Sequence, residues 1–428
     1  DFYTYRYFAS EGFLPGYNFP RLPLSAFIPA RRRQSGRNDF LSRPRFLAIA
    51  EFGPRAMVYH EGRRYRIDRV IIPTEARGEG EQTIARHAAK TCKSCGYLHH
   101  IGEPPGPDVC DHCGGDLDVL MPNLFRLENV ETRRRDRITS DEEERFRRGY
   151  ELRTAYRFAE RDGSESCHVG EVVGSDGVLA RLAYGDAATL WRINYGWRRR
   201  KTKEPGFNLD LERGWWDSRD MVEEDGDDPS LSNNIARVIP YVEDRKNLLL
   251  FQPTADLDAT QMASLQAAMK TAIQSHYQIE EGELAAEPLP SEDDRQQIMF
   301  YEASEGGAGV LKRLVAEPDA LASVARQALR ACHFDPVTGD DLGGPERRND
   351  DCVAACYDCL MSYQNQRDHA LLDRDAVQPL LMAYASSTVP ASPTGRSRGE
   401  QMDYLLANAG SDLEQRWLRW LDGSGHRL

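Results

Sequence analysis

The chain has no long hydrophobic run. Nowhere in its 428 residues do apolar side chains approach the roughly 18 consecutive positions that a membrane-spanning helix needs, so we expect no membrane partner. The chain opens on Asp1-Phe2-Tyr3, without an initiator Met and without the charged-then-apolar leader of a secreted protein. These two features predict a cytoplasmic piece of a longer protein.

A phosphate-binding loop of the form G-x-x-x-x-G-K-[ST] is also missing. The acidic run 141–144 is the nearest match to the metal-binding carboxylates of an ATPase. It follows Ser140 and precedes the basic stretch 145–148, which is the pattern of a capped helix start with acids in its first turn. The sequence therefore predicts a helix over 140–148, no catalytic residues and no ATPase activity in this chain.

The composition is that of a globular protein, with 40% apolar and 29% charged residues, and the length predicts two or three hydrophobic cores. The net charge of −13 is unevenly distributed. Residues 1–203 carry 35 Lys and Arg against 28 Asp and Glu, and the rest of the chain carries 20 against 40. Although the chain as a whole is acidic, its first half can still present a basic face to nucleic acid.

Eight of the nine cysteines form two groups of four. The first group consists of two C-x2-C pairs, each followed by Gly, at Cys92, Cys95, Cys110 and Cys113. Two residues between thiolates allow one short turn to place both sulfurs on one metal ion, and four thiolates complete a tetrahedral structural zinc site. Disulfides would require an oxidising compartment, for which nothing in the sequence provides support. We predict a zinc ribbon here.

The second group predicts another zinc site. Cys352, Cys356 and Cys359 form a C-x3-C-x2-C run, and Cys332 can supply the fourth thiolate. The same three-cysteine spacing is typical of the iron–sulfur cluster in radical SAM enzymes, which remains an alternative. Those enzymes need a long βα barrel after the motif, whereas only 69 residues follow Cys359. The preferred cofactor is therefore Zn²⁺ at two sites.

The second group and its surroundings resemble the MrfA-type zinc-binding (MZB) domain, which occurs toward the C-terminal side of large superfamily 2 DEAD/DEAH-box helicases, including repair helicases and phage-defence helicases of the DISARM and Druantia type. The chain departs from the family pattern at Glu302, where Asp is expected. The stretch 5–20 resembles the segment that follows the second motor lobe in large members. The matching residues are Glu302-Ala-Ser-Glu-Gly306-Gly307-Ala308-Gly309, Cys332, Cys352, Cys356, Cys359-Leu360, Asn365, His369 and Leu372-Asp373-Arg374.

The resemblance implies an accessory region of an ATP-dependent DNA helicase that acts in DNA repair or antiviral defence. Its expected partners are DNA, single-stranded or duplex, the motor domains of the same polypeptide, and further subunits of a defence system. We expect a mixed α+β and α/β fold, in which a β-rich module with an inserted zinc ribbon precedes an α/β four-cysteine module. The expected parts are an extended segment with strands (1–75), the zinc ribbon (76–122), a β-rich basic module (123–203), an acidic linker (204–233), the MZB-like domain (234–385), and a linker with a terminal helix (386–428).

Hydrophobic periodicity predicts the elements within these parts. Expected strands lie at 45–51, 56–60, 64–72, 169–173, 178–184, 189–195, 235–242, 247–252 and 296–303, with a hairpin turn at Glu61-Gly62. Expected helices lie at about 258–277, 308–316 and 319–332. The stretch 386–399 is expected to be a flexible linker.

One segment interleaves aromatic and basic residues as nucleic-acid-binding strands do. Its arginines and lysines can contact phosphates, and Tyr195 or Trp197 can stack on a base. A structural alternative is a strand with its aromatics in the core and a solvated basic end. Arg31–Arg33 and Arg133–Arg135 are weaker basic runs, each expected in a solvated turn. The candidate residues are Trp191, Arg192, Tyr195, Trp197, Arg198, Arg199, Arg200, Lys201 and Lys203.

Two other classes of function remain open. The terminal segment 411–421, with Ser411 and Glu414 at its start, is amphipathic and resembles the first helix of PD-(D/E)xK-type nucleases. A docking helix is the simpler interpretation. The non-enzymatic alternative is a protein-interaction scaffold in which zinc has a purely structural role.

Overall fold

The structure is a computed structural model that describes residues 23–29, 39–72, 86–137, 149–161, 164–217, 230–303, 307–344, 352–390, 398–409 and 411–424. The chain divides into two compact units. Unit 1 comprises Asp1–Arg157 and Thr189–Arg245, and unit 2 comprises Phe158–Ala188 and Lys246–Leu428. The structure contains both strands and helices packed on hydrophobic cores, so the fold is mixed α+β, as predicted. The segment 5–20, the run Arg31–Arg33 and the helix expected at 140–148 lie outside the described residues.

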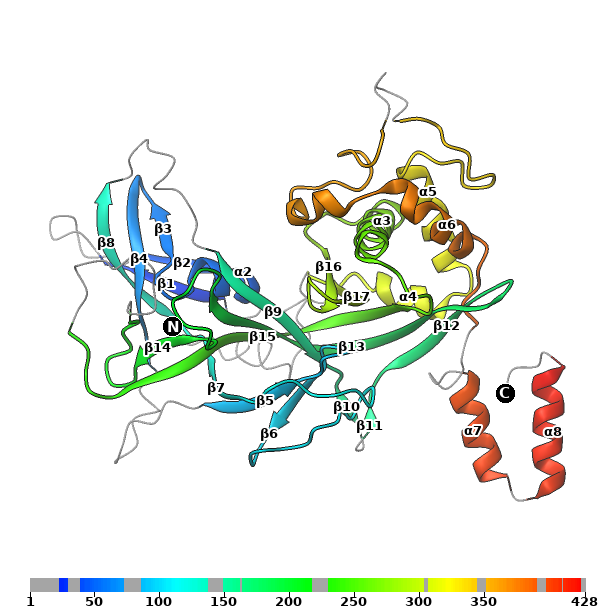
Figure 1. The fold of residues 1–428 in the computed structure, drawn as a ribbon, viewed down its shortest axis with the longest axis horizontal. Helices are drawn as coiled ribbons and strands as arrows, with labels where there is room; N and C mark the ends of the chain where they lie inside the picture. Colours follow the sequence, from blue (N-terminus) through cyan, green and yellow to red (C-terminus); the bar gives the residue numbers. More distant parts are fainter. Residues whose placement is uncertain are drawn as a thin grey trace. The chain divides into compact units, whose positions relative to one another are not determined.

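Unit 1 is rich in β-structure (Figure 1). Its strands are β1 (Leu24–Ile28), β2 (Asp39–Arg43), β3 (Met57–His60), β4 (Arg63–Val70), β5 (His87–Thr91), β6 (Leu98–Ile101), β7 (Met121–Arg126), β8 (Val130–Arg137), β9 (Tyr150–Arg157) and β14 (Phe207–Asp210), with parts of β13 (Gly177–Trp197) and β15 (Ile235–Pro253). Among the described residues of unit 1, α2 (Arg45–Glu51) is the helix.

Five of these strands form a sheet in the order β2-β1-β8-β4-β3. Strands β3 and β4 form the hairpin expected around Glu61-Gly62. The core on one face of this sheet includes Ala26 of β1, Val58 of β3 and Ile67 of β4. Because successive side chains of a strand point to opposite faces, the residues between them form the second face of this sheet.

The segment Arg45–Glu51, which was expected to be a strand, is helix α2. It begins directly after Pro44, whose φ of −51° suits a helix start. Ala48 and Ile49 are its buried residues, so one side of a short helix packs on the core of unit 1. A seven-residue apolar run shows too few turns for periodicity to separate helix from strand.

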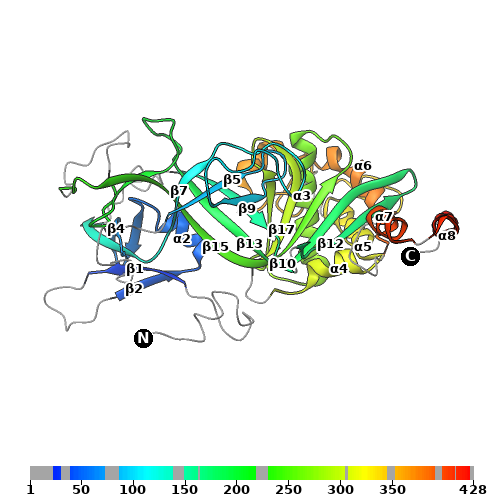
Figure 2. The same ribbon diagram turned by 90° about the horizontal axis from the view of Figure 1, so that it is seen from below.

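Unit 2 places helices over strands (Figures 1 and 2). Its strands are β10 (Glu160–Arg161), β11 (Ser164–Glu165), β12 (His168–Gly174), β16 (Leu284–Pro290) and β17 (Arg295–Glu302), with the remaining parts of β13 and β15. Its helices are α3 (Ala259–Tyr277), α4 (Val310–Ala316), α5 (Ala320–Ala331), the 3-10 helix η3 (Gln366–Leu371), α6 (Arg374–Ala385), α7 (Arg398–Asn408) and α8 (Asp412–Gly423).

The helices expected at 258–277, 308–316 and 319–332 correspond to α3, α4 and α5. A capping box starts α3, in which Asp258 accepts a hydrogen bond from the Gln261 N–H and the Gln261 side chain accepts one from the Asp258 backbone N–H. Buried residues of these helices pack against β15, β16 and β17 in one core. Every helix in the described part of the chain is too short or too polar to cross a lipid bilayer.

Several expected elements are longer or additional in the structure. The strands expected at 178–184 and 189–195 are one continuous β13, and those expected at 235–242 and 247–252 are one continuous β15. Within the stretch expected to be an acidic linker, β14 pairs with the first part of β15. Helix α7 begins at the end of the stretch expected to be a flexible linker.

Candidate metal centres and nucleic-acid-binding residues

The first cysteine group is built from two matching turns in unit 1. In the first turn, the Gly96 N–H donates to the Cys92 carbonyl over 3.0 Å, and in the second the Gly114 N–H donates to the Cys110 carbonyl over 2.9 Å. Both glycines have a positive φ, 75° and 74°, which L-residues rarely adopt. Each C-x2-C-G sequence therefore encodes the same local reversal, and the two reversals bring four thiols together.

The spacing of the four sulfurs fits one metal ion. The ligand atoms of Cys92, Cys95, Cys110 and Cys113 all lie within 4.8 Å of one another. Cys92 Sγ lies 3.4 Å from Cys113 Sγ, and Cys95 Sγ lies 3.8 Å from Cys110 Sγ. With a zinc–sulfur distance of about 2.3 Å, the edge of a regular tetrahedron is about 3.8 Å. A disulfide would require sulfurs about 2.05 Å apart, so this geometry is that of a metal-binding site.

Polar groups surround these sulfurs. The N–H groups of Ser94 and Cys95 point at Cys92 Sγ over 3.4 and 3.5 Å. The buried ring of His99 lies with Nε2 3.3 Å from Cys110 Sγ and Nδ1 3.4 Å from Asp111. Hydrogen bonds, that from Cys95 first, lower the pKa of the Cys110 thiol. The surroundings thus stabilise a thiolate at Cys110, which is the form that binds metal.

The second group contains a histidine. The atoms that lie within 4.8 Å of one another belong to His333, Cys352, Cys356 and Cys359. Cys352 Sγ is 3.8 Å from Cys359 Sγ, and His333 Nε2 is 3.3 Å from Cys356 Sγ. A tetrahedral zinc with one imidazole and three thiolates has edges of about 3.5 and 3.8 Å. The geometry therefore corresponds to a site of three cysteines and one histidine, whereas the sequence was interpreted as a four-cysteine site.

The backbone brings His333, the residue after Cys332, to this group. Helix α5 ends at Cys332, whose side chain is completely buried in the core of unit 2. His333 has a φ of 65°, so the chain turns sharply at this residue and its ring reaches the cysteine loop. The sulfur of Cys332 is not among the four ligand atoms that lie within 4.8 Å of one another. Burial lowers the pKa of His333, which favours the neutral imidazole that a metal requires.

Arg374 holds the loops around the second group together. Its guanidinium forms a bidentate ion pair with Asp341, at 2.7 and 2.6 Å, and donates to the Cys332 carbonyl over 3.2 Å. Its backbone N–H donates to the Ala354 carbonyl inside the cysteine loop. The side chain is only 4% exposed. One buried cation thus links the end of α5, the loop after it and the loop that carries three ligands.

His369 and Asn365 support the chain directly after Cys359. Asn365 donates to the Leu360 carbonyl over 2.8 Å and accepts from the Ser362 N–H over 2.7 Å. His369 Nε2 lies 3.1 Å from the Ser362 carbonyl and 3.2 Å from Asn365 Oδ1. Both residues therefore position the loop that carries the ligands.

The Gly-rich turn is part of the framework of unit 2. Glu302 is 1% exposed, and its carboxylate accepts hydrogen bonds from Asn247 Nδ2 over 2.9 Å and from the Leu311 N–H at the start of α4 over 3.2 Å. Gly307 lies against this carboxylate. In the part of the turn that the structure describes, 307–309, Gly307 thus faces the protein's own carboxylate.

The aromatic residues that were expected to stack on bases lie in the core of unit 1. Trp191, Tyr195 and Trp197 are 4%, 9% and 5% exposed. Trp191 Nε1 donates to Glu243 over 3.2 Å, and Trp197 stacks on Tyr150 at 4.6 Å. Their faces are already used in packing, so this part of the sequence interpretation differs from the structure. The alternation of aromatic and basic residues along β13 resembled a strand with one exposed binding face. In the structure, side chains on both faces of this part of β13 are buried.

The basic residues of the same segment divide into two groups. Arg192 lies over the ring of Phe46 at 5.6 Å. Arg198 donates to the Tyr150 carbonyl over 3.0 Å, and Arg200 forms an ion pair with Glu151 at 3.0 Å. Arg199, Lys201 and Lys203 are exposed in the loop that follows β13. The loop 198–203 is thus the part of the segment that nucleic acid can reach.

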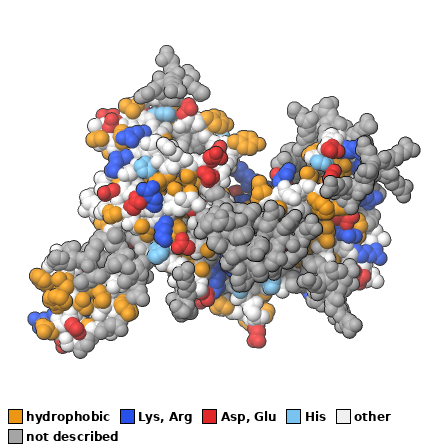
Figure 3. Space-filling model, turned by 180° about the vertical axis from the view of Figure 1, so that it is seen from behind, with side chains coloured by type: hydrophobic (Ala, Val, Ile, Leu, Met, Phe, Trp, Pro, Cys, Tyr) orange, Lys and Arg blue, Asp and Glu red, His pale blue; other side chains and the backbone are white. Residues whose placement is uncertain are grey.

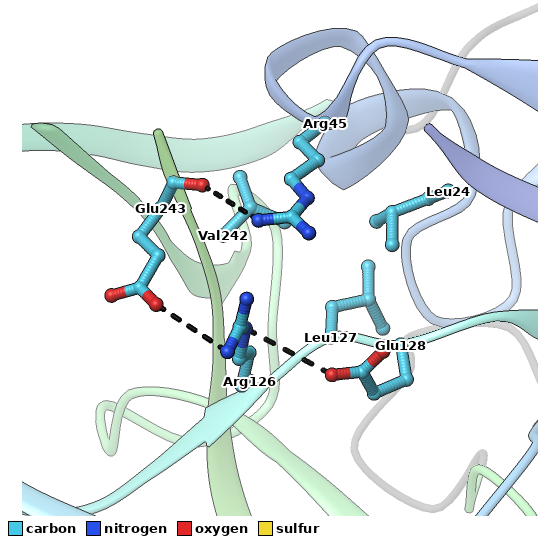
Figure 4. Close-up of a pocket in the computed structure, with 7 residues that line it drawn as sticks. All are labelled: Leu24, Arg45, Arg126, Leu127, Glu128, Val242 and Glu243. Carbon is cyan, nitrogen blue, oxygen red and sulfur yellow. Dashed lines mark hydrogen bonds and ion pairs between the residues drawn. The ribbon is translucent and has the colours of Figure 1, made fainter. Parts of the chain in front are cut away.

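A small cavity in unit 1 also has charged walls (Figure 4). Its lining residues are Leu24, Arg45, Arg126, Leu127, Glu128, Val242 and Glu243. Arg126 lies between Glu243 and Glu128, at 3.5 and 3.8 Å, and Arg45 donates to the Glu243 carbonyl over 3.4 Å. Two arginines and two glutamates balance one another, so the cavity has no net charge with which to select an ion.

Comparisons with known proteins agree with the second metal centre. A family model described as the MrfA Zn-binding domain (MZB) matches residues 265–360, which include all four members of the histidine-containing group. Among solved structures, "Crystal Structure of DUF1998 helicase MrfA bound to DNA" is similar with a TM-score of 0.39 at 10% identity, over 84% of this chain and 33% of that one. This chain thus spans about a third of the length of that chain. No curated protein matches. Residues 265–360 of this chain thus match the MrfA Zn-binding domain, the family that the cysteine spacing and the Gly-rich turn resemble.

Proposed function

We propose that this chain is a zinc-stabilised, nucleic-acid-binding accessory region of an ATP-dependent DNA helicase that acts in DNA repair or phage defence. The observation that carries the proposal is the MZB match over a segment whose four ligand atoms are already gathered. The resemblance of the sequence to helicases with this domain supplies the link to a motor. The motor domains of the same polypeptide and further defence-system subunits are the proposed partners, besides DNA.

We propose Zn²⁺ as the ion at both centres, held by Cys92, Cys95, Cys110 and Cys113, and by His333, Cys352, Cys356 and Cys359. Both sets offer four ligands in tetrahedral spacing with no position left for substrate, which supports a structural role. The [4Fe–4S] cluster of a radical SAM enzyme would bind each cysteine to a different iron and would hold their sulfurs further apart than the 3.8 Å between Cys352 and Cys359. The spacing therefore favours one ion over a cluster.

The isolated chain should show no ATPase activity, with or without DNA. The sequence has no phosphate loop, and the Gly-rich turn contacts Glu302. Phosphate release from purified chain, measured with and without single-stranded DNA, should remain at the level of buffer. The sample should be a preparation that has bound both zinc ions. Turnover on the order of 1 per second would contradict this expectation.

The loop 198–203 should contribute phosphate contacts. Replacing Arg199, Lys201 and Lys203 together with Ala should weaken binding to unrelated DNA sequences to a similar extent, because phosphate contacts carry no sequence information. The slope of log K against log salt should fall by about two to three, at roughly 0.7 to 0.9 per lost contact. Fluorescence anisotropy at several salt concentrations would measure both effects.

A charge-matched variant provides the control for this experiment. Lys312, Arg313 and Arg367 are exposed cations of unit 2 that pair with Asp186, Glu317 and Glu292. Their combined replacement with Ala removes the same three charges and should leave the slope close to that of the unmodified chain. If both triple variants lowered the slope by the same amount, the effect would belong to net charge, and this would count against a contact by the loop.

One observation favours a second function, that of a protein-docking scaffold. Hydrophobic side chains gather on the surface of the α7–α8 hairpin, at the lower left of Figure 3. On α8, Leu413, Trp417 and Trp420 are 73%, 59% and 63% exposed. Ser411 caps this helix by accepting from the Glu414 N–H. An exposed apolar helix face of this kind is typical of a surface that docks another protein.

A further inference from the structure

The sulfurs of the two metal centres differ in their access to solvent. In the first centre Cys92, Cys95 and Cys110 are buried, whereas Cys113 is exposed. In the second centre three of the four ligands are buried and the fourth, Cys356, is half-buried. Small solutes can therefore reach a sulfur of the first centre directly, at Cys113.

A second thiol lies next to the exposed one. Cys92 Sγ is 3.4 Å from Cys113 Sγ, so the two sulfurs have to approach by only about 1.4 Å to form a disulfide. In the second centre, the half-buried Cys356 Sγ has the His333 ring at 3.3 Å, and a ring nitrogen cannot form a disulfide. The first centre thus combines an exposed sulfur with a sulfur neighbour.

The backbone after Cys113 can follow such a movement. Gly114 has a positive φ of 74°, and a Cβ at this position would meet no atom within 4 Å. A Cβ at Gly115 would lie 2.8 Å from Ser94 Oγ and 3.3 Å from Cys113 Sγ, so the missing side chain leaves space beside this sulfur. Two consecutive glycines therefore allow the end of the knuckle to move toward Cys92.

We propose that Cys113 is an oxidation site, at which a peroxide converts the first centre into a Cys92–Cys113 disulfide and releases its zinc ion. The proposal rests on the zinc that the proposed function assigns to this centre, and it adds a redox-sensitive switch in unit 1. Cysteines that bind zinc are held as thiolates, which is the form that reacts with peroxides.

The reaction consumes one hydrogen peroxide molecule in two steps. The Cys113 thiolate attacks one peroxide oxygen and the O–O bond breaks, which leaves a sulfenic acid and a hydroxide that takes up a proton to become water. The Cys92 thiolate then attacks the sulfenic sulfur, so that an S–S bond forms, the S–O bond breaks and a second hydroxide becomes water. Each thiolate gives up one electron and the peroxide gains two, while zinc leaves as Zn²⁺.

The disulfide would loosen the zinc ribbon within unit 1. The first knuckle lies between β5 and β6 (Figure 1), and the Cys92 N–H donates to the Tyr97 carbonyl over 2.9 Å. The Tyr97 ring stacks on His112 of the second knuckle at 5.0 Å and packs edge-on against Tyr156 of β9 at 5.4 Å. A movement of the second knuckle would therefore take His112 off Tyr97. The ligands of the second centre belong to unit 2 and should keep their ion.

The test follows zinc release from the full chain after hydrogen peroxide is added to reduced protein. A chromophoric zinc chelator measures the released ion. The unmodified chain should release one ion at least about tenfold faster than the other, because Cys113 is exposed and the ligands of the second centre are buried or half-buried. Dithiothreitol with added zinc should restore the form with two ions, because a disulfide can be reduced.

Peptide mapping without reduction identifies the bond that forms. Digestion with trypsin and Asp-N protease places Cys92 in peptide 91–93, Cys95 in 94–107, Cys110 in 108–110 and Cys113 in 111–115. We expect peptide 91–93 joined to 111–115 in the oxidised chain. A chain that loses its first ion with 94–107 joined to 108–110, and without the expected pair, would contradict the proposal.

A variant and a matched control test the role of the exposed sulfur. Cys113→His removes this sulfur and keeps a ligand atom, because histidine also binds zinc. It should hold two ions before oxidation and release the ion of the first centre at least about tenfold more slowly than the unmodified chain. Cys356→His makes the same exchange at the half-buried ligand of the second centre, and it should release its first ion as fast as the unmodified chain.

The outcomes separate this switch from the proposed function. If the reduced chain contains no zinc, the proposed function fails at its metal centres. If it contains two ions and keeps both, releases both at the same rate, or loses the first together with oxidation of Cys352 or Cys359, the proposed function stands and the switch is excluded. Should Cys113→His not bind two ions, the peptide map of the unmodified chain decides the question. Peptide 91–93 joined to 111–115 supports the proposal, and the absence of this pair overturns it.

Discussion

Replacing His333 with Ala should remove one of two zinc ions per chain, whereas replacing Cys332 with Ala should leave both bound. His333 Nε2 is 3.3 Å from Cys356 Sγ, whereas the sulfur of Cys332 is not among the four ligand atoms that lie within 4.8 Å of one another. Structural zinc contributes about 10–16 kcal/mol of apparent binding free energy, so losing a ligand should also unfold the region around the second centre. Cys332→Ala removes one buried atom and should cost only about 1 kcal/mol.

Elemental analysis of protein kept reduced, together with thermal unfolding, would test this pair of variants. His276→Ala provides a histidine control, because His276 is exposed on α3. It should bind two zinc ions and unfold like the unmodified chain. The reverse result, with zinc lost from Cys332→Ala and kept in His333→Ala, would restore the four-cysteine assignment. Cys356→Ser should resemble His333→Ala, because it removes another of the four ligands.

The sequence could predict the cysteine ligands because their spacing encodes local turns. The C-x2-C-G pattern requires only one reversal, and both reversals of unit 1 have the same hydrogen bond. The fourth ligand of unit 2 depends on which side chain at the end of α5 faces the cysteine loop. Adjacent residues Cys332 and His333 are both of types that bind metals in proteins, and the φ of 65° that selects His333 is a tertiary feature. The available signal was that a histidine directly follows Cys332, the residue expected to supply the fourth ligand.

Elements with a long or well-marked pattern were predictable, and short ones were not. Helix α3 shows five turns of helical periodicity after a capping residue. Helix α2 has only seven residues, and its best signals were the preceding Pro44 and its Ala and Leu content, which favour helix. The strands β13 and β15 were each divided in the prediction because their polar interruptions resemble turns. Pairing with neighbouring strands keeps them continuous.

Aromatic residues between basic residues gave a misleading signal at 191–197. Along β13 the aromatics are buried, because strands and loops cover both of its faces. Whether such an aromatic side chain is exposed is decided by tertiary packing, which one segment of the sequence does not show.

Ala at Gly307 should destabilise unit 2 much more than Ala at Gly309, although both glycines have a similar positive φ of 69° and 71°. An Ala at Gly309 would meet no other atom within 4 Å, so it should cost only the roughly 1–2 kcal/mol of left-handed backbone. A Cβ at residue 307 would overlap Glu302 Oε2 and come within 2.5 Å of Asn247 Nδ2.

The buried Glu302 carboxylate would then have to give up hydrogen bonds to Asn247 and to the start of α4, which should raise the total cost of Gly307→Ala to about 3 kcal/mol or more. Urea unfolding of both variants would measure the difference, with Gly309→Ala as the internal reference for backbone strain. Combining Gly307→Ala with Glu302→Ala should add less than the sum of the two changes, because the smaller side chain leaves room for the new methyl group. Equal losses for the two glycine variants would mean that the carboxylate moves aside at no cost, and that the Gly-rich turn is required only for its backbone conformation.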